Sequence, residues 1–593
     1  MPPQDSSCST HECHSQRDAH LTKSVATLRL TQITFRAGAA TGAVPLQITP
    51  GNVTVLVGPN NSGKSLALQE IEQMCLVTPA SDNAPKVIEA IGVDLPGEID
   101  DVIARLQPFG DPETPPLDLF GNEQMAITYP NILNVGAALT MITPRSNIAA
   151  TILNSPDDLE LRSLLLKGYT IRLDGRTRFD LVAGQPLGDL RRVPQNHLSA
   201  LYRDDHARQR LQAITEDVFG RYFLIDGTDP QHLQIRLGKE SPPSTELEHS
   251  LTAEAISFYD RADLLTNFGD GIQAFVGLLS AVMSLPHTII LLDEPETFLH
   301  PPLARRLGLE LTRIARDRNA SLVVATHDAD FLMGCLDEPR GTSIARLTYE
   351  DGKATTRASD SAELTPMMRH PLFRSTGVLR ALFHRGAVIT EADADRVFYD
   401  EINQRLLGDK RGTKDVLFLN AQNWQTEPEL VRPLRRIGIP AVAIVDFHTL
   451  FETDMPKLIN ACNVEESERL YHERDSIWKT IASLGHDKKA VKKAVKAQGV
   501  SLLDKTDQAR LEALLEQLGH YGLFLVPNGE LESWLKNLGI TGHTPGWLIT
   551  MFSRIAELDG TPNAVRPASD DVWVFLDHVA RWIDNPSRRG MGS

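Results

Sequence analysis

The chain has 593 residues, of which 41% are hydrophobic and 23% are charged, a balance typical of a globular protein with two to four domains. Its formal net charge of −17 argues against indiscriminate coating of nucleic acid, although it leaves room for a local basic surface. No apolar run approaches the roughly 20 residues of a membrane span, so we expect no membrane partner.

The composition of the N-terminal residues and the number of cysteines indicate the cellular compartment of the protein. Residues 1–25 are polar and lack the apolar segment of a secretory signal, so we predict a disordered leader there. The five cysteines are odd in number and scattered, which favours a reducing environment over a disulfide framework. We therefore expect a cytoplasmic protein.

An α/β pattern begins at Thr27. Alternating apolar residues predict strands in "LRLTQITFRA" and "VPLQITPGNVTVLVG", and helical spacing follows in "SLALQEIEQMCL". Residues 77–250 contain Pro-rich breaks and an amphipathic helix, and we interpret them as a partly helical insertion that is a candidate for dimerisation. Further on, "HTIILLDEPE" and "ASLVVATHD" are typical of buried parallel strands.

A complete G-x-x-x-x-G-K-[ST] motif lies between the second strand and the helix that follows it. Its glycines let backbone N–H groups wrap phosphates, its lysine reaches the terminal phosphates, and its serine hydroxyl ligates Mg²⁺. The strand before it and the helix after it are the context that this motif requires. The predicted ATP-binding residues are Gly58, Asn60, Asn61, Ser62, Gly63, Lys64 and Ser65.

A second acidic motif follows the apolar residues "IILL". Asp293 ends that strand and can hold Mg²⁺ through water, while Glu294 can polarise the attacking water. His327 comes just after another buried strand of the same predicted sheet, and we interpret it as a sensor of the γ-phosphate. Isolated acids and histidines are more often structural, but the strands that precede these residues favour the catalytic interpretation.

Acids also follow three apolar strands of a second α/β series that begins near Gly386. Because the carboxyl ends of parallel strands meet at one edge of a sheet, these acids are expected to converge there. Grouped oxygen ligands suit Mg²⁺ or Mn²⁺, and two such ions can hydrolyse a phosphodiester. The predicted ligands are Glu391, Asp395, Asp446, Glu530 and Glu532, with His448 beside them.

Two basic stretches are candidates for DNA contact. "HDKKAVKKAVKAQG" places five lysines mainly along one helical face, and "VRPLRRIG" adds three arginines. Lysine runs are usually solvated faces, so contact with phosphates and a solvated surface stay open as alternatives. The residues are Lys488, Lys489, Lys492, Lys493, Lys496, Arg432, Arg435 and Arg436.

The phosphate loop, the "DEPETFLHP" segment and His327 together resemble the ABC-type ATPase fold over roughly residues 26–340. The sequence "DEPETFLHP" is similar to the form found in the soluble branch of this family, which is related to DNA-repair ATPases, and not to the form found in transporters. In that family a signature loop binds the ATP of a second subunit, and "NFGDGIQA" takes its place here, with Gly269 and Gly271 as the candidate contacts. The resemblance implies a homodimer or higher oligomer that closes on ATP.

The second acidic series resembles a Toprim domain in Glu391-(x)₃-Asp395, Asp446 and "GELE". An ABC-type ATPase domain over residues 26–375 followed by a Toprim domain over residues 376–593, with a helical insertion at 464–520, resembles the OLD (overcoming lysogenisation defect) nucleases and the layout of the Gabija nuclease subunit. This resemblance implies metal-dependent DNA cleavage regulated by ATP, in anti-phage defence, with a second defence protein as a candidate partner.

Two positions depart from the Toprim pattern. His448 stands where a second aspartate is usual, which favours Mn²⁺ over Mg²⁺, removes one metal or leaves Asp454 to substitute as ligand, and Ala392 replaces a glycine. A competing interpretation is therefore an ATPase scaffold or sensor whose Toprim domain is inactive and only binds nucleic acid or a protein. A transporter ATPase is disfavoured because it leaves the second acidic domain unexplained.

Overall fold

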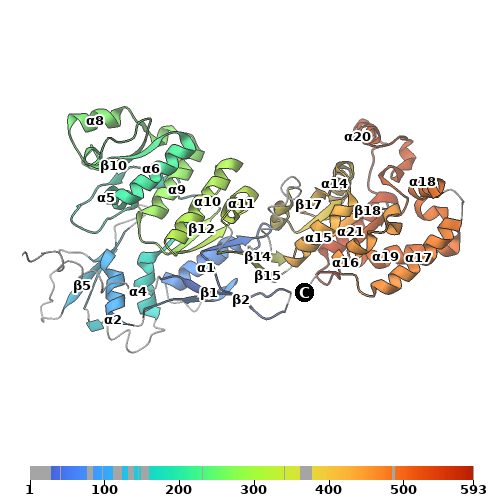
Figure 1. Cartoon of the computed structure of the whole chain (residues 1–593), viewed down its shortest axis with the longest axis horizontal. Coiled ribbons are helices and arrows are strands. Elements are labelled where there is room, and N and C mark those ends of the chain that lie inside the picture. Colours follow the sequence, from blue (N-terminus) through green and yellow to red (C-terminus); the bar gives the residue numbers. More distant parts are fainter. Residues whose placement is uncertain are drawn as a thin grey trace, which may run out of the picture. The chain divides into compact units, whose positions relative to one another are not determined.

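The computed structural model describes residues 28–40, 42–76, 84–96, 98–110, 123–130, 139–144, 146–147, 159–229, 231–338, 341–350, 352–360, 377–483 and 488–591 (Figure 1). The predicted leader at residues 1–25 lies outside this part. The chain forms two compact units. One takes in residues up to Ile33, Leu68–Leu303 and Glu310–Val323, and the other takes in Thr34–Ala67, Ala304–Leu309 and Val324 onward.

A six-stranded sheet carries the motifs of the predicted ATPase. Its strand order is β15-β14-β3-β13-β12-β7, in which β14 pairs parallel with β3 and antiparallel with β15, and β12 pairs parallel with β7. Every residue of β3 is buried, which explains why four of the five residues in its sequence "VTVLV" are apolar. The strands are β3 (Val53–Val57), β7 (Thr170–Leu173), β12 (Ile289–Asp293), β13 (Ser321–Ala325), β14 (Thr342–Glu350) and β15 (Lys353–Asp360).

The strand predicted over "VPLQITPGNVTVLVG" is two strands. β2 (Leu46–Ile48) pairs with β1 (Leu30–Phe35) in a three-stranded sheet completed by β4 (Ile88–Val93), whereas β3 joins the six-stranded sheet. Residues 49–52 separate the two strands, and a Cβ on Gly51 would lie 2.1 Å from the carbonyl oxygen of Gly341. The close approach of that backbone explains why the strand breaks there.

Residues 77–250 contain sheet strands as well as helices. β7 lies in this range and pairs with β12, so the range is not one continuous insertion. The rest holds a hairpin, β5 (Gln124–Tyr129) with β6 (Leu139–Pro144), and a small sheet around β10. Other elements here and just beyond are α2 (Ile99–Leu106), α4 (Leu159–Tyr169), α5 (His197–Arg203), α6 (Asp205–Phe219), α7 (Thr245–Glu248), α8 (Ala253–Asp260), β8 (Gln185–Pro186), β9 (Tyr222–Asp226), β10 (His232–Gly238) and β11 (Asp263–Leu264).

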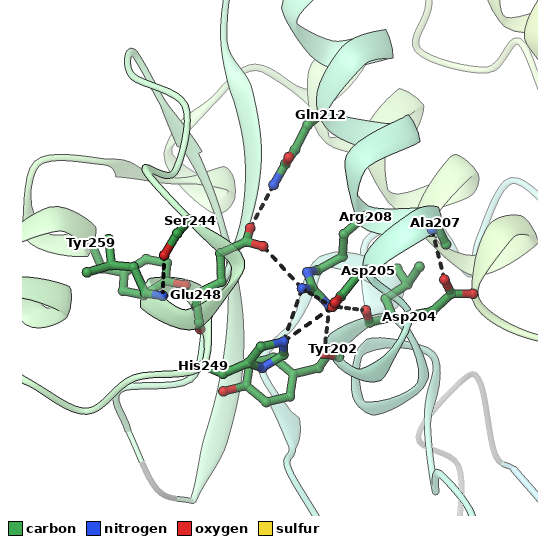
Figure 2. A network of polar contacts seen from close by, with 12 residues as sticks. Tyr202, Asp204, Asp205, Ala207, Arg208, Gln212, Ser244, Glu248, His249 and Tyr259 are labelled. Carbon is green, nitrogen blue, oxygen red and sulfur yellow. Dashed lines mark hydrogen bonds and ion pairs between the residues drawn. The ribbon is translucent and has the colours of Figure 1, made fainter. Parts of the chain in front are cut away.

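A buried ion-pair network ties α6 to α7 in the first unit (Figure 2). Arg208 is 1% exposed and donates to Glu248 at 3.1 Å and to Asp205 at 2.6 Å, and its other terminal nitrogen donates to two backbone carbonyls of α5. Gln212 donates to the second oxygen of Glu248 at 2.7 Å. Each buried charge therefore has an opposite charge and further hydrogen bonds.

The C-terminal part of the second unit is a four-stranded parallel sheet in the order β17-β16-β18-β19. Because all four strands run the same way, the residues after their last positions lie along one edge. Helices cover the sheet with a core that includes Phe398, Tyr399 and Trp573. The strands are β16 (Gly386–Thr390), β17 (Val416–Asn420), β18 (Ala441–Asp446) and β19 (Leu523–Val526).

The charged stretch 464–520 is helical, as its sequence predicts. It contains α17 (Ser467–Ser483), α18 (Lys488–Gln498) and α19 (Lys505–Gly519). The other helices of this part are α14 (Asp393–Gly408), α15 (Glu427–Arg436), α16 (Met455–Ala461), α20 (Gly546–Leu558) and α21 (Asp571–Asp584). None of the helices in the described part of the chain is both long enough and apolar enough to cross a bilayer.

Candidate functional site

The phosphate loop lies between β3 and α1 (Lys64–Leu76). Gly58 has φ +141° and Gly63 has φ +93°, backbone conformations that favour glycine, and a Cβ on Gly58 would lie 2.0 Å from the carbonyl oxygen of Leu347. Lys64 is 4% exposed, and its Nζ donates to the carbonyls of Gly58 and Pro59 at 2.9 Å each. The loop therefore has the tight, glycine-dependent form that a phosphate cradle needs. Asn60, Asn61 and Ser65 are exposed along it, and Ser62 is buried.

The second acidic motif forms a turn at the end of β12. Glu294 is exposed and has φ +48°, a strained conformation for a glutamate. Arg178, which is 1% exposed, donates to the carbonyls of Glu294, Pro295 and Thr297. Burial lowers the pKa of Arg178 to about 10. This arginine holds the strained turn, and no motif in the sequence identifies it.

The signature-like loop precedes α9 (Asp270–Ser284) in the first unit. Gly269 is the residue before the helix and is exposed, and Gly271 lies in the first turn, where a Cβ would be 3.0 Å from the carbonyl oxygen of Phe298. Gln273 donates from its side chain to the carbonyl of Phe268 at 2.7 Å. The loop therefore lies at the start of a helix, which is the position that the sequence predicts for it.

His327 follows β13 in the second unit and is half-buried. Burial, and then the positive charge of Lys64, lower the pKa of His327 to about 4, so the imidazole is neutral near pH 7. Its ring centroid lies 6.5 Å from that of Phe383. A neutral histidine can donate one N–H to a phosphate oxygen, which fits the predicted role of sensor.

The five predicted carboxylate ligands share one cavity of about 630 Å³ at the carboxyl edge of the parallel sheet, and His448 is not among its lining residues. Glu391 follows β16, Asp395 lies in the first turn of α14, and Asp446 ends β18. The structure thus brings together acids that are up to 141 positions apart, as the parallel order predicts. The lining residues are Glu391, Ala392, Ala394, Asp395, Asp446, Lys493, Lys496, Ala497, Glu530, Leu531, Glu532, Ser533, Lys536, His543 and Thr544.

Three of these acids have raised pKa values. Burial and the neighbouring Glu391 raise the pKa of Asp395 to about 7. Burial is also the main cause of the raised pKa values of Glu391 and Asp446, with further contributions from the negative charges around them. Within the described residues, Oε2 of Glu391 is buried and has no hydrogen-bond partner. A cavity that holds this much unfavourable negative charge suits a cation.

Lysine and histidine complete the cavity. Nζ of Lys496 lies 2.5 Å from Oε1 of Glu530. His448 lies beside the cavity wall, with Nδ1 3.8 Å from Oδ2 of Asp446, and Asp446, His448 and Glu530 each present one ligand atom within 4.8 Å of the others. Glu532 instead accepts hydrogen bonds from the backbone and hydroxyl of Thr544 at 2.8 and 3.0 Å. The oxygen and imidazole donors fit Mn²⁺ or Mg²⁺, and the imidazole favours Mn²⁺.

The residue Glu427 was missed by sequence reasoning. It begins α15, is 0% exposed, and neither of its carboxylate oxygens has a hydrogen-bond partner in the described part of the chain. Burial raises its pKa well above the usual range, and the nearby carboxylate of Glu391 adds to the effect. Its sequence setting, "TEPELVRPLRR", reads as an ordinary helix start with an acid in its first turn.

The two basic stretches have different outcomes. Lys493 is exposed, and together with Lys496 it lines the cavity. Arg435 is fully buried and donates to the carbonyls of Ala441, Cys462 and Gly590, so it stabilises the fold and cannot contact DNA. The side chains of Lys488, Lys489 and Lys492 lie outside the described residues.

One stretch of the chain is similar to a known protein family. Residues 193–334 match a family described as "AAA domain, putative AbiEii toxin, Type IV TA system". No curated protein matches the chain.

Among solved structures, the chain is similar to the SMC head domain from Thermotoga maritima at 15% identity and a TM-score of 0.28, over 56% of this chain and 99% of that one. It is also similar to the Smc head domain bound to the C-terminal domain of ScpA from Pyrococcus furiosus, at 12% identity and a TM-score of 0.29, over 58% and 99% of the two chains. The family match supports an AAA-type ATPase domain over residues 193–334, and the phosphate loop at residues 58–65 precedes this range in the chain.

Proposed function

We propose that this protein is an ATP-regulated, divalent-metal-dependent DNA endonuclease of the OLD type. The observation that carries the proposal is the cavity around Glu391, Asp395 and Asp446, where five acids line the wall beside three lysines and burial raises the pKa values of these three acids. The Toprim resemblance of the sequence assigns these same positions to metal binding.

The residues divide the work of phosphodiester cleavage among them. Glu391, Asp395, Asp446, His448 and Glu530 would hold Mg²⁺ or Mn²⁺, which supplies an activated water and stabilises the leaving oxygen. With a metal bound to Glu530, the ammonium of Lys496 is free to meet a DNA phosphate. Lys493 and Lys536 add positive charge to the same wall.

The ATPase domain regulates this cavity in our proposal. Lys64 and Ser65 bind the ATP phosphates and Mg²⁺, Asp293 supports the metal, Glu294 activates water and His327 senses the γ-phosphate. Gly269 and Gly271 serve the ATP of a second copy, so the working form is a homodimer or larger. The match to a family described as a toxin–antitoxin system agrees with a role in anti-phage defence, with or without a second defence protein.

Plasmid cleavage tests the proposal. With Mn²⁺ or Mg²⁺, we expect the wild type to nick or cut plasmid DNA, and Glu391→Ala to lose about a thousandfold or more in rate, because a metal site supplies several kcal/mol of transition-state stabilisation. Asp393→Ala is the matched control, since Asp393 is two positions away, is 65% exposed and pairs with Arg396.

Two outcomes oppose the proposal. Equal cleavage by the wild type and Glu391→Ala would place the activity elsewhere. A wild type that cleaves no DNA with either metal, with or without ATP, would favour an ATPase scaffold whose second site only binds nucleic acid or protein. The His448 departure and the lysine already seated on Glu530 are the features that support this alternative.

A further inference from the structure

The second unit contains both the phosphate loop and the acidic cavity, and a small set of buried contacts joins them. The short helix η4 (Val378–Phe383) ends three residues before the start of β16, the strand that Glu391 follows. Phe383 is 9% exposed, and its ring lies 6.5 Å from that of His327 at an interplanar angle of 48°. A movement of His327 would therefore meet the residue that leads into β16.

A second contact starts from β14. Arg346 is 5% exposed and pairs in register with Val57, the residue before the phosphate loop. One of its terminal nitrogens donates to the carbonyl of His384 at 2.8 Å and the other to the carbonyl of Gly438 at 3.0 Å. His384 leads into β16 and Gly438 leads into β18, so one guanidinium holds the starts of both acid-bearing strands.

The surrounding contacts make the start of β16 rigid. His384 Nδ1 lies 2.8 Å from Oδ1 of Asp415, and the backbone N–H of Arg385 donates to the carbonyl of Asp415 at 2.9 Å. The side chain of Arg385 donates to Glu350, at the end of β14, at 2.9 Å. A hydrogen-bonded strand of five residues transmits a displacement along its length rather than absorbing it.

We propose that Phe383 and Arg346 are positioning residues that couple the nucleotide state of the phosphate loop to the spacing of Glu391 and Asp446. This inference rests on the proposed function of the cavity. His327 is neutral near pH 7 and changes its hydrogen bonding when a γ-phosphate is present. Phe383 passes that change to β16, while Arg346 passes any shift of β3 and β14 to both β16 and β18. The distance between the two metal-binding carboxylates then depends on the nucleotide.

The test uses Phe383→Leu, which keeps an apolar side chain and removes the ring, and Arg346→Met, which keeps most of the volume and removes the two hydrogen bonds. Arg380→Ala in the same short helix is the control, because Arg380 is exposed. ATP binding and hydrolysis are expected to stay within about twofold of the wild type in all three. ATP is expected to change the rate of plasmid cleavage by the wild type. In Phe383→Leu and Arg346→Met this effect of ATP is expected to be about tenfold smaller, or to vanish if the wild-type effect is itself below tenfold. Such a change is within the usual range of coupling between sites.

Hydrogen exchange supplies a readout that does not need nuclease activity. In the wild type and in Arg380→Ala, ATP is expected to change amide exchange in β16 and β18, and in Phe383→Leu and Arg346→Met this response is expected to be lost. A normal ATP response of β16 and β18 in both Phe383→Leu and Arg346→Met would overturn the proposal. A wild type in which ATP changes exchange in neither strand would also overturn it. If the wild type cleaves no DNA but its strands respond through Phe383 and Arg346, the coupling holds and the nuclease assignment fails.

Discussion

Two buried clusters of ionisable residues in this molecule differ in whether their charges are paired with opposite charges. In the first unit, Arg208 and Glu248 neutralise each other, Gln212 donates to Glu248, and backbone carbonyls accept from Arg208, whose Nε alone lacks a hydrogen-bond partner among the described residues (Figure 2). In the second unit, acids crowd a cavity and burial raises the pKa values of Asp395 and Asp446. Both clusters are buried, so burial alone does not distinguish structure from function.

The balance of charge does distinguish them. A cluster that satisfies itself needs no ligand, and its loss is felt as lost stability. A cluster that is left with excess charge is costly to fold and is relieved only by a proton, a lysine or a metal ion. We therefore expect substitutions in the first cluster to destabilise the protein, and some substitutions in the second to stabilise it while removing activity.

The largest effect on stability is expected from breaking the balanced cluster. Arg208→Met leaves the carboxylate of Glu248, which is 6% exposed, without its partner, and is expected to cost about 3–5 kcal/mol. Arg210→Met is the control, because Arg210 makes a surface pair with Asp317 and should cost less than about 1 kcal/mol. Urea unfolding of both variants measures the difference. Equal losses would mean that the buried network is no more important than a surface ion pair.

The second prediction concerns pH in the unbalanced cluster. The pKa of Asp395 is about 7 in the folded protein and near 3.8 in the unfolded chain, so the folded state holds the extra proton between these values. Stability from this group is therefore highest below about pH 4, falls as pH rises, and is lost above about pH 7. At pH 8 without metal, Asp395→Asn is expected to unfold at a higher temperature than the wild type, with the difference shrinking toward pH 5.

Adding Mn²⁺ provides the counterpart of that experiment. A metal bound by Asp395 and its neighbours should raise the unfolding midpoint of the wild type more at pH 8 than at pH 5, and should raise that of Asp395→Asn less. Thermal scans with EDTA or Mn²⁺ at both pH values measure this. A wild type that is already more stable than Asp395→Asn at pH 8 in EDTA would show that the cavity carries no unfavourable charge.

The two clusters also show which functional and structural residues could be predicted from the sequence and which could not. The phosphate loop and the acids after β16, β18 and β19 were predictable, because a motif or a strand end fixes each position. Arg178 and Arg208 were not, because each takes its role from carbonyls or carboxylates up to 119 positions away that only the fold brings near. Glu427 looks like a common helix start, and Arg435 looks like part of a basic surface although it is buried.

The smallest expected effect concerns the metal preference of the acidic cavity, which one substitution at His448 tests. His448 Nδ1 lies 3.8 Å from Asp446, in the group whose ligand atoms lie within 4.8 Å of one another. An imidazole is a better ligand for Mn²⁺ than for Mg²⁺, whereas a carboxylate suits Mg²⁺ well. His448→Asp adds one more acid, so it should tighten Mg²⁺ binding and lower the ratio of Mn²⁺ to Mg²⁺ affinity by about tenfold, or ~1.4 kcal/mol. Calorimetric titration of each metal measures that ratio without relying on cleavage. The control is His520→Asp, because His520 is exposed.

An unchanged ratio would remove His448 from the ligand set and leave Glu391, Asp395, Asp446 and Glu530 to bind the metal alone. A lowered ratio accompanied by a lower unfolding midpoint at pH 8 in EDTA would show that the added carboxylate enlarges the same excess of charge that separates this cavity from the Arg208 network.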